Sequence, residues 1–114
     1  MIAVVFEVWP REGRRADYLA LAASLRGSLA EIDGFISVER FESLTEPGKL
    51  LSLSFWRDEA ALTAWRAVHE HRAAQGMGRT EMFADYRLRV AGVIRDYGMT
   101  EREQAPADSR AAHG

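Results

Sequence analysis

The sequence predicts a single α+β domain in which strands and helices follow the order β-α-β-β-α-β. Three observations support this prediction. Short apolar runs have the length and residue types of strands, two longer segments carry apolar residues at helical spacing, and turn residues separate them. The 114 residues suit one domain, and the sequence contains neither an internal repeat nor a linker that would mark a second one.

The first strand and the first helix occupy the N-terminal third of the chain. Residues 1–9 are apolar except for Glu7, which is typical of a central strand with two buried faces, and Pro10 ends the run because it has no backbone donor. The next segment extends to Gly34, a plausible helix stop. Its apolar residues recur at helical spacing: Tyr18, Ala22, Leu25 and Leu29.

The middle of the chain predicts a hairpin followed by a second helix. Residues 35–41 and 50–56 alternate in polarity, and the turn 43–49 between them contains Pro47 and Gly48. Asp58 is a good N-cap for the helix that follows. The apolar face of this helix carries Ala61, Leu62, Trp65, His69 and Arg72, and Gly76 and Gly78 end it. A fourth strand lies within residues 82–98.

This order of elements is that of the ferredoxin-like βαββαβ fold, a four-stranded antiparallel sheet with two helices on one face. The strands are apolar on both phases, so the second face of the sheet also needs a cover. We therefore expect a homodimer that joins sheet to sheet. The domain is expected to span residues 1–99, and the polar tail 100–114 is expected to be disordered, because it has almost no large apolar residue.

Composition excludes several classes of protein. Hydrophobic residues make up 47% and charged residues 28%, as in soluble globular domains. A net charge of −2 argues against a nucleic-acid partner. The absence of cysteine excludes disulfides and thiolate chemistry. No apolar run has membrane-spanning length, and the N-terminal run has no basic segment before it, so we expect a cytoplasmic protein without a membrane partner.

Four segments together resemble a known family: "FEVWPREGR" (6–14), "EIDGFISVERFESLTEPGKLLSLSFWRDEAALTAWR" (31–66), "EHRAAQGMGR" (70–79) and "FADYRLRVAGVIRDYGM" (83–99). The family is the antibiotic biosynthesis monooxygenase (ABM) domain, of the dimeric α/β-barrel superfamily, and the resemblance covers roughly residues 1–99. It implies a dimeric barrel with a pocket between sheet and helices in each subunit. Several members oxygenate polycyclic phenols or quinols without metal, flavin or haem, whereas others bind or degrade haem.

Oxygenation without a cofactor has simple physical needs. The substrate must become an anion that can give an electron to O₂, inside an apolar site that offers a base and donors for the anion. We predict a monooxygenase that oxidises a small phenolic, quinol-like or polycyclic aromatic compound, with O₂ as co-substrate and no bound cofactor. The alternatives are a non-catalytic module that binds a small aromatic molecule, and a relative that binds or degrades haem.

Three residues are the candidates for catalysis. Glu7 would act as base or anchor if it faced the helices, where desolvation would raise its pKa. Otherwise Glu7 would form a structural ion pair with an arginine such as Arg72 or Arg87. Trp65 is either an aromatic wall of the pocket or a core residue. His69, four residues further on, is either a pocket donor or base or a partly exposed histidine.

Other residues are candidates for substrate contacts. His69 and His71 point about 200° apart on a helix, so they cannot bind one metal together, and no metal site is predicted. His71 is either a polar contact or a surface residue. Arg87 lies in a phase that is either a positive rim for an anionic substrate or a charged outer face. The full set of predicted contacts is Trp9, His71, Phe83, Tyr86 and Arg87.

The resemblance argues against haem as a cofactor. Haem-degrading relatives use an asparagine near the end of the first strand, a tryptophan in the second helix and a histidine that ligates the iron. The corresponding residues here are Glu7, Trp65 and Gln75. Of these three residues only the tryptophan is kept, and the iron ligand is lost, so we do not expect haem to be bound in the way those relatives bind it.

Overall fold

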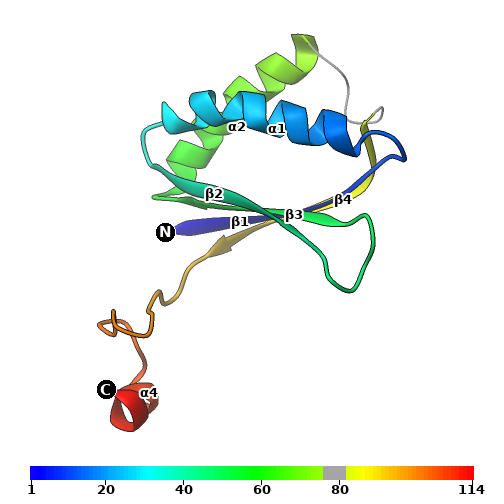
Figure 1. Ribbon diagram of the computed structural model, residues 1–114. Coiled ribbons are helices and arrows are strands. Elements are labelled where there is room, and N and C mark those ends of the chain that lie inside the picture. The colour runs from blue at the N-terminus through cyan, green and yellow to red at the C-terminus, as the bar shows by residue number, and fades with distance from the viewer. Residues whose placement is uncertain (76–81) are drawn as a thin grey trace.

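The order of elements confirms the predicted ferredoxin-like arrangement. A computed structural model describes the backbone of residues 1–75 and 82–114 and the side chains of residues 1–68 and 82–114. The elements are β1 (Ile2–Pro10), α1 (Arg15–Ala30), β2 (Phe35–Glu42), β3 (Leu50–Trp56), α2 (Glu59–Gln75), β4 (Phe83–Gly92) and α4 (Ala107–His113). The strands form an antiparallel sheet in the order β2-β3-β1-β4 (Figure 1).

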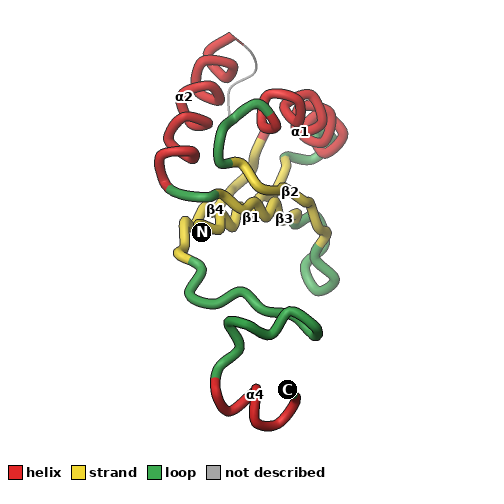
Figure 2. The backbone as a smooth tube through the Cα atoms, turned by 90° about the vertical axis from the view of Figure 1, so that its left-hand side faces the viewer, coloured by secondary structure: helices red, strands yellow, loops and turns green. Residues whose placement is uncertain are grey.

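Both long helices cover the same face of the sheet (Figures 1 and 2). The core lies between these two layers and consists of two clusters. The first joins Val4, Leu29, Trp56 and Ala61, and the second joins Val8, Tyr18, Leu50 and Met82. Trp56 is 1% exposed and Val8 is fully covered, because alternate residues of β1 and β3 point at the helices.

The predicted N-cap of α2 is confirmed. The Ala61 N–H donates to Oδ1 of Asp58 over 2.9 Å, which satisfies one of the free donors at the start of the helix. That bond, followed by the contact with Arg57, lowers the pKa of Asp58. Gly34 passes close to this helix with φ of +93°, and a Cβ there would lie 2.8 Å from Cβ of Ala61. The corner between α1 and β2 therefore requires glycine.

The second face of the sheet, which we call the outer face, has no helix of the domain against it (Figure 2). Its apolar residues are only partly covered, and Phe41 is 42% exposed. The others are Val5, Leu51, Leu53 and Phe55. This pattern is what a cover by a second copy would need, and the homodimer stays a prediction.

The tail differs from the predicted disorder. After β4 the chain leaves the sheet on the side opposite α1 and α2 and ends in the short helix α4 (Figure 1). Arg102 holds it together, because its guanidinium donates to Oγ of Ser109 and to the carbonyl oxygens of Gly98 and Gly114. Polar bonds thus replace the apolar contacts that the tail lacks. Within the described residues, no helix is both long and apolar enough to span a bilayer.

Candidate functional site

A cavity of about 450 Å³ lies between the two helices and the sheet. Cross-strand rows form its floor, because residues paired across antiparallel strands share a face. One row runs Val38–Ser54–Val4–Val90 and the next runs Arg40–Ser52–Phe6–Leu88. The roof comes from α1 with Tyr18, Leu21, Ala22, Leu25 and Leu29, and from α2 with Leu62, Trp65 and Arg66. A cavity of this size suits a small organic ligand.

Aromatic rings form much of the wall. The rings of Phe6 and Tyr86 lie 5.6 Å apart, and Tyr86 is 6.1 Å from Phe83, both pairs meeting edge to face. At the other end the ring of Trp65 lies 6.5 Å from that of the buried Trp56. The structure therefore brings three of the predicted residues, Trp65, Phe83 and Tyr86, to one cavity.

Polar groups enter the cavity mainly from β2 and β3. Ser54 Oγ accepts a hydrogen bond of 2.9 Å from Nε1 of Trp56. Ser52 is its neighbour on the same side of β3, and Arg40 lies opposite Ser52 in register. Nε of Arg40 is buried and has no hydrogen-bond partner among the described residues. Sequence analysis did not single out Arg40, although it shares the phase of Val38 in β2.

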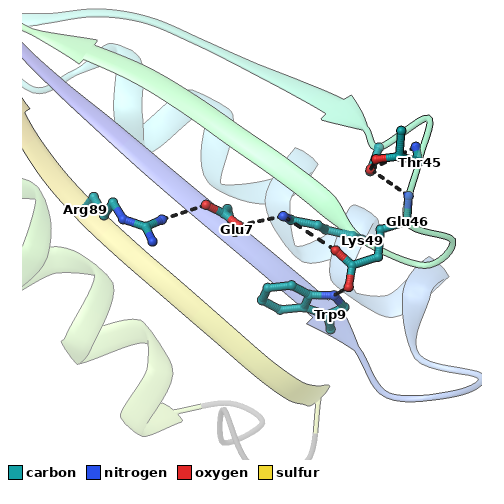
Figure 3. A network of polar contacts seen from close by, with 7 residues as sticks. Glu7, Trp9, Thr45, Glu46, Lys49 and Arg89 are labelled. Carbon is teal, nitrogen blue, oxygen red and sulfur yellow. Dashed lines mark hydrogen bonds and ion pairs between the residues drawn. The ribbon is translucent and has the colours of Figure 1, made fainter.

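Glu7 lies on the outer face, not in the cavity. Its Oε2 is 2.7 Å from Nζ of Lys49, and its Oε1 accepts a hydrogen bond of 2.6 Å from Nη1 of Arg89 (Figure 3). The bond from Lys49, and then that from Arg89, lowers the pKa of Glu7 below its ordinary value. The prediction of a raised pKa is therefore wrong. The alternative of an ion pair is confirmed, with Lys49 and Arg89 as partners in place of the predicted Arg87. The side chain of Arg72 lies outside the described residues.

Trp9 and Arg87 also lie away from the cavity. Nε1 of Trp9 donates to Oε1 of Glu46 over 3.2 Å, and Lys49 Nζ lies 5.1 Å from the centre of the Trp9 ring (Figure 3). Arg87 is the register partner of Glu7 and shares its face. The geometry therefore favours the charged outer face for Arg87 and gives Trp9 no contact with a ligand in the cavity.

Two predicted residues cannot be placed at the site. The side chains of His69 and His71 lie outside the described residues. Among the side chains that are described, no group of three metal-binding residues occurs, and the cavity wall includes no carboxylate.

These features define a ferredoxin-like α+β domain with an aromatic cavity between its helices and its sheet. The family model described as antibiotic biosynthesis monooxygenase matches residues 1–77. The chain therefore belongs to the ABM family.

Two curated relatives match parts of the chain. The "Jasmonate monooxygenase ABM" of Pyricularia oryzae is 50% identical over 93 residues, which cover 82% of this chain and 43% of the relative. The "Uncharacterized protein YqjZ" of Bacillus subtilis is 35% identical over 66 residues, or 58% of this chain and 56% of that protein. The chain thus spans about half the length of the curated relatives it matches.

Solved structures share the fold at low sequence identity. Rv0793 from Mycobacterium tuberculosis has a TM-score of 0.72 at 20% identity, over 85% of this chain and 98% of its own. SnoaB from Streptomyces nogalater, a cofactor-independent oxygenase, has a TM-score of 0.67 at 13% identity, over 83% and 94%. An MhuD variant with two manganese protoporphyrin IX molecules per active site has a TM-score of 0.69 at 14% identity, over 86% and 99%.

Proposed function

We propose that this ABM-family chain is a cofactor-independent monooxygenase for a small cyclic compound with an ionisable phenol or enol. The observation that carries the proposal is the cavity of about 450 Å³ with six aromatic side chains in its wall: Phe6, Tyr18, Trp56, Trp65, Phe83 and Tyr86. Such a wall holds a flat apolar ring and dissolved O₂ better than it holds water. The name of the fungal relative and that of SnoaB support the same class of reaction.

The reaction that suits such a site needs no outside electrons. Loss of a proton from the hydroxyl of the phenol or enol, or from the activated CH₂ group of its keto form, gives the same anion. Its carbon forms a C–O bond with O₂, and the peroxide oxygen takes up a proton to give a hydroperoxide. The O–O bond then breaks as the second C–H proton leaves, so that the products are C=O and H₂O. The four electrons lost by the carbon reduce both oxygen atoms, one in the ketone and one in water.

Residues of the cavity would hold the substrate ring and remove its proton. Trp65, Phe83 and Tyr86 would hold the ring, and the hydroxyl of Tyr86 would be a polar contact. We propose His69 as the base, because the spacing of four residues along α2 is that of one helical face with Trp65. Glu7 has no part in this proposal, since its carboxylate is bound on the outer face.

The test is O₂ uptake by the purified, metal-stripped protein with a panel of quinols, anthrones and polycyclic phenols. We expect uptake above that of an enzyme-free control, with one water formed per O₂ and a ketone from the anthrones or a hydroxylated or quinone product from the quinols and phenols. The same uptake with and without the protein across the panel would contradict the proposal. Ligands that bind without any O₂ uptake would instead favour the non-catalytic binding module.

Jasmonate belongs in the same panel because of the fungal relative's name. Insertion of one oxygen atom into an unactivated C–H bond leaves the second atom in need of two electrons. This arm is therefore run with and without a nicotinamide reductant. Uptake only with the reductant would mean that the chain requires an electron donor and would contradict the cofactor-independent reaction.

Haem is not the proposed cofactor, although the MhuD structure shows that a metalloporphyrin fits this fold. The choice rests on the resemblance, because the histidine that ligates iron in haem-degrading relatives corresponds to Gln75 in this chain. A titration with haemin tests this directly. A Soret shift with saturation at one or two haems per chain would contradict the exclusion.

We also propose that two chains associate through their outer faces. The partly exposed residues Phe41 and Leu53 are the targets of the test. The doubly substituted F41D/L53D chain should elute at the monomer mass of 12.8 kDa, whereas the natural chain should have twice that mass in multi-angle light scattering. L44D, in the fully exposed β2–β3 turn, is the matched control and should stay dimeric. A natural chain of monomer mass would contradict the proposal.

A further inference from the structure

The cavity has a cationic side and an apolar side. Along one row of its floor, Arg40 and Ser52 come from β2 and β3, whereas Phe6 and Leu88 come from β1 and β4. Paired positions in an antiparallel sheet have Cβ atoms only about 5 Å apart, so the side chains of Arg40 and Ser52 start from neighbouring points on one face of the sheet, and both line the cavity. A ligand that spans this row meets hydrogen-bond donors at one end and hydrocarbon at the other.

The charge of Arg40 is not neutralised within the described protein. Glu42, two residues further along the same face of β2, is instead paired with Arg15 of α1 over 2.9 Å. Glu39 has the opposite phase and belongs to the outer face. The charged residues in the described cavity wall are Arg40 and Arg66, both cationic. The cavity therefore attracts negative charge and contains no described carboxylate to compete for it.

The buried Nε of Arg40 points to a contact that the described residues do not supply. This atom has no hydrogen-bond partner among the described residues. Leaving a buried donor without an acceptor is costly, and more so for a charged group, so folded proteins rarely keep one without a reason. An anionic oxygen at this end of the cavity would accept from Nε and neutralise the charge.

We infer that Arg40, with Ser52 beside it, binds an anionic oxygen of the substrate and so selects an apolar ring that carries one carboxylate, phenolate or enolate. The inference extends the proposed function, and it rests on that function in taking the bound anion to be the substrate. A guanidinium next to a phenol or enol also favours its ionised form, which is the form that reacts with O₂. Arg40 then acts as the specificity-determining residue of the cavity.

The test compares two probes of equal shape and different charge, 2-naphthoate and 2-naphthamide, by isothermal titration calorimetry. The natural protein should bind the acid at least about 10-fold more tightly, which corresponds to one charge-assisted hydrogen bond. R40M should reduce this ratio to about 1, and R40K, which keeps the charge, should retain part of it. R26M is the matched control, because Arg26 is exposed on α1 and does not line the cavity, and it should keep the ratio.

A second probe measures directly whether a bound phenol is ionised. Absorbance of bound 2-naphthol reports its ionisation, and the natural protein should bind the phenolate at a lower pH than that at which free naphthol ionises. R40M should abolish that shift. A preference for naphthoate without a shift for naphthol assigns the site to carboxylates, the reverse assigns it to phenolates, and either result supports the inference.

Several outcomes would overturn it. These are equal affinity of the natural protein for acid and amide combined with no shift for naphthol, binding of none of the probes, or a ratio and a shift that R40M leaves unchanged. If R40M does not fold, R40Q replaces it and must lose the ratio as well. A protein that prefers the acid and consumes no O₂ would keep this inference and refute the proposed function. O₂ uptake with phenols that R40M consumes as fast as the natural protein would do the opposite.

Discussion

The two faces of the sheet differ in whether their charged side chains have partners within the described protein. On the outer face the carboxylate of Glu7 lies between Lys49 and Arg89, so its charge is matched by the protein itself. On the cavity face the guanidinium of Arg40 has no described acceptor for its buried Nε. The comparison teaches that a charged residue on a central strand does not by itself mark a site. The group that is left without a partner beside a cavity is the better candidate.

The largest expected effect concerns the core under the cavity. Trp56 is 1% exposed and joins the β3 floor to Trp65 of α2. We expect W56A to lower the free energy of unfolding by about 3–5 kcal/mol, as for other buried aromatic residues. F41A, on the outer face, should cost less than about 1 kcal/mol. Urea denaturation measures both, and a loss in F41A as large as that in W56A would contradict the difference between the faces.

The next effect separates a crowded glycine from an open one. G34A should lower the free energy of unfolding by about 2 kcal/mol, because φ of +93° strains alanine and its Cβ would collide with Ala61. G27A is the matched control, since a Cβ at this helical position has open space around it. It should raise stability by up to about 1 kcal/mol. Equal losses in both variants would refute the close approach at Gly34.

A smaller effect compares two tryptophans in turnover. W65A removes a wall of the cavity, so kcat/KM for O₂ uptake should fall about 10-fold, or about 1.4 kcal/mol. W9A removes a tryptophan from the outer face, where it contacts Glu46 and Lys49, and should leave kcat/KM within about 2-fold. A larger loss in W9A than in W65A would mean that the reaction takes place at the outer face, and it would contradict the cavity as the site.

The smallest effect is a change with pH in E7Q. The lowered pKa of Glu7 means that its ion pairs stabilise the fold above the unfolded value of about 4.3 and are lost as the pH falls through the folded value. The raised pKa of Lys49 extends this stabilisation to the alkaline side, until the pH rises above about 10.4.

Thermal unfolding from pH 3 to pH 9 provides the measurement. The natural chain should melt above E7Q at neutral pH, and the gap should close below about pH 4. Turnover at pH 7 should be the same in both proteins. A gap that grows in acid would mean that the carboxyl group is stabilised in its neutral form.

Much of the fold could be predicted from local patterns. The N-cap Asp58, the turn around Gly48 and the spacing from Tyr18 to Leu29 depend on neighbouring residues only, and all are present. Alternation in β1 separates Val4, Phe6 and Val8 from Val5, Glu7 and Trp9. It does not say which set faces the helices when both are largely apolar.

The rest of the site could not be predicted, because it depends on contacts between residues that lie far apart in the sequence. Arg89, which binds Glu7, lies 82 residues away, and no local pattern pairs them. Arg40 reads as a solvent-facing residue of an alternating strand, and only its register with Ser52 places it at the cavity. Trp65, Phe83 and Tyr86 could be predicted because large aromatic residues on inward phases meet wherever helices cover a sheet.

The tail has a consequence for how association depends on concentration. It leaves the sheet on the outer side, where a second copy would pack, and ends in α4 (Figure 1). A polypeptide that continued from this point into another such domain would hold the two sheets at a local concentration in the millimolar range. Two separate chains must meet by diffusion and come apart on dilution. A fused pair would stay together however scarce the protein becomes.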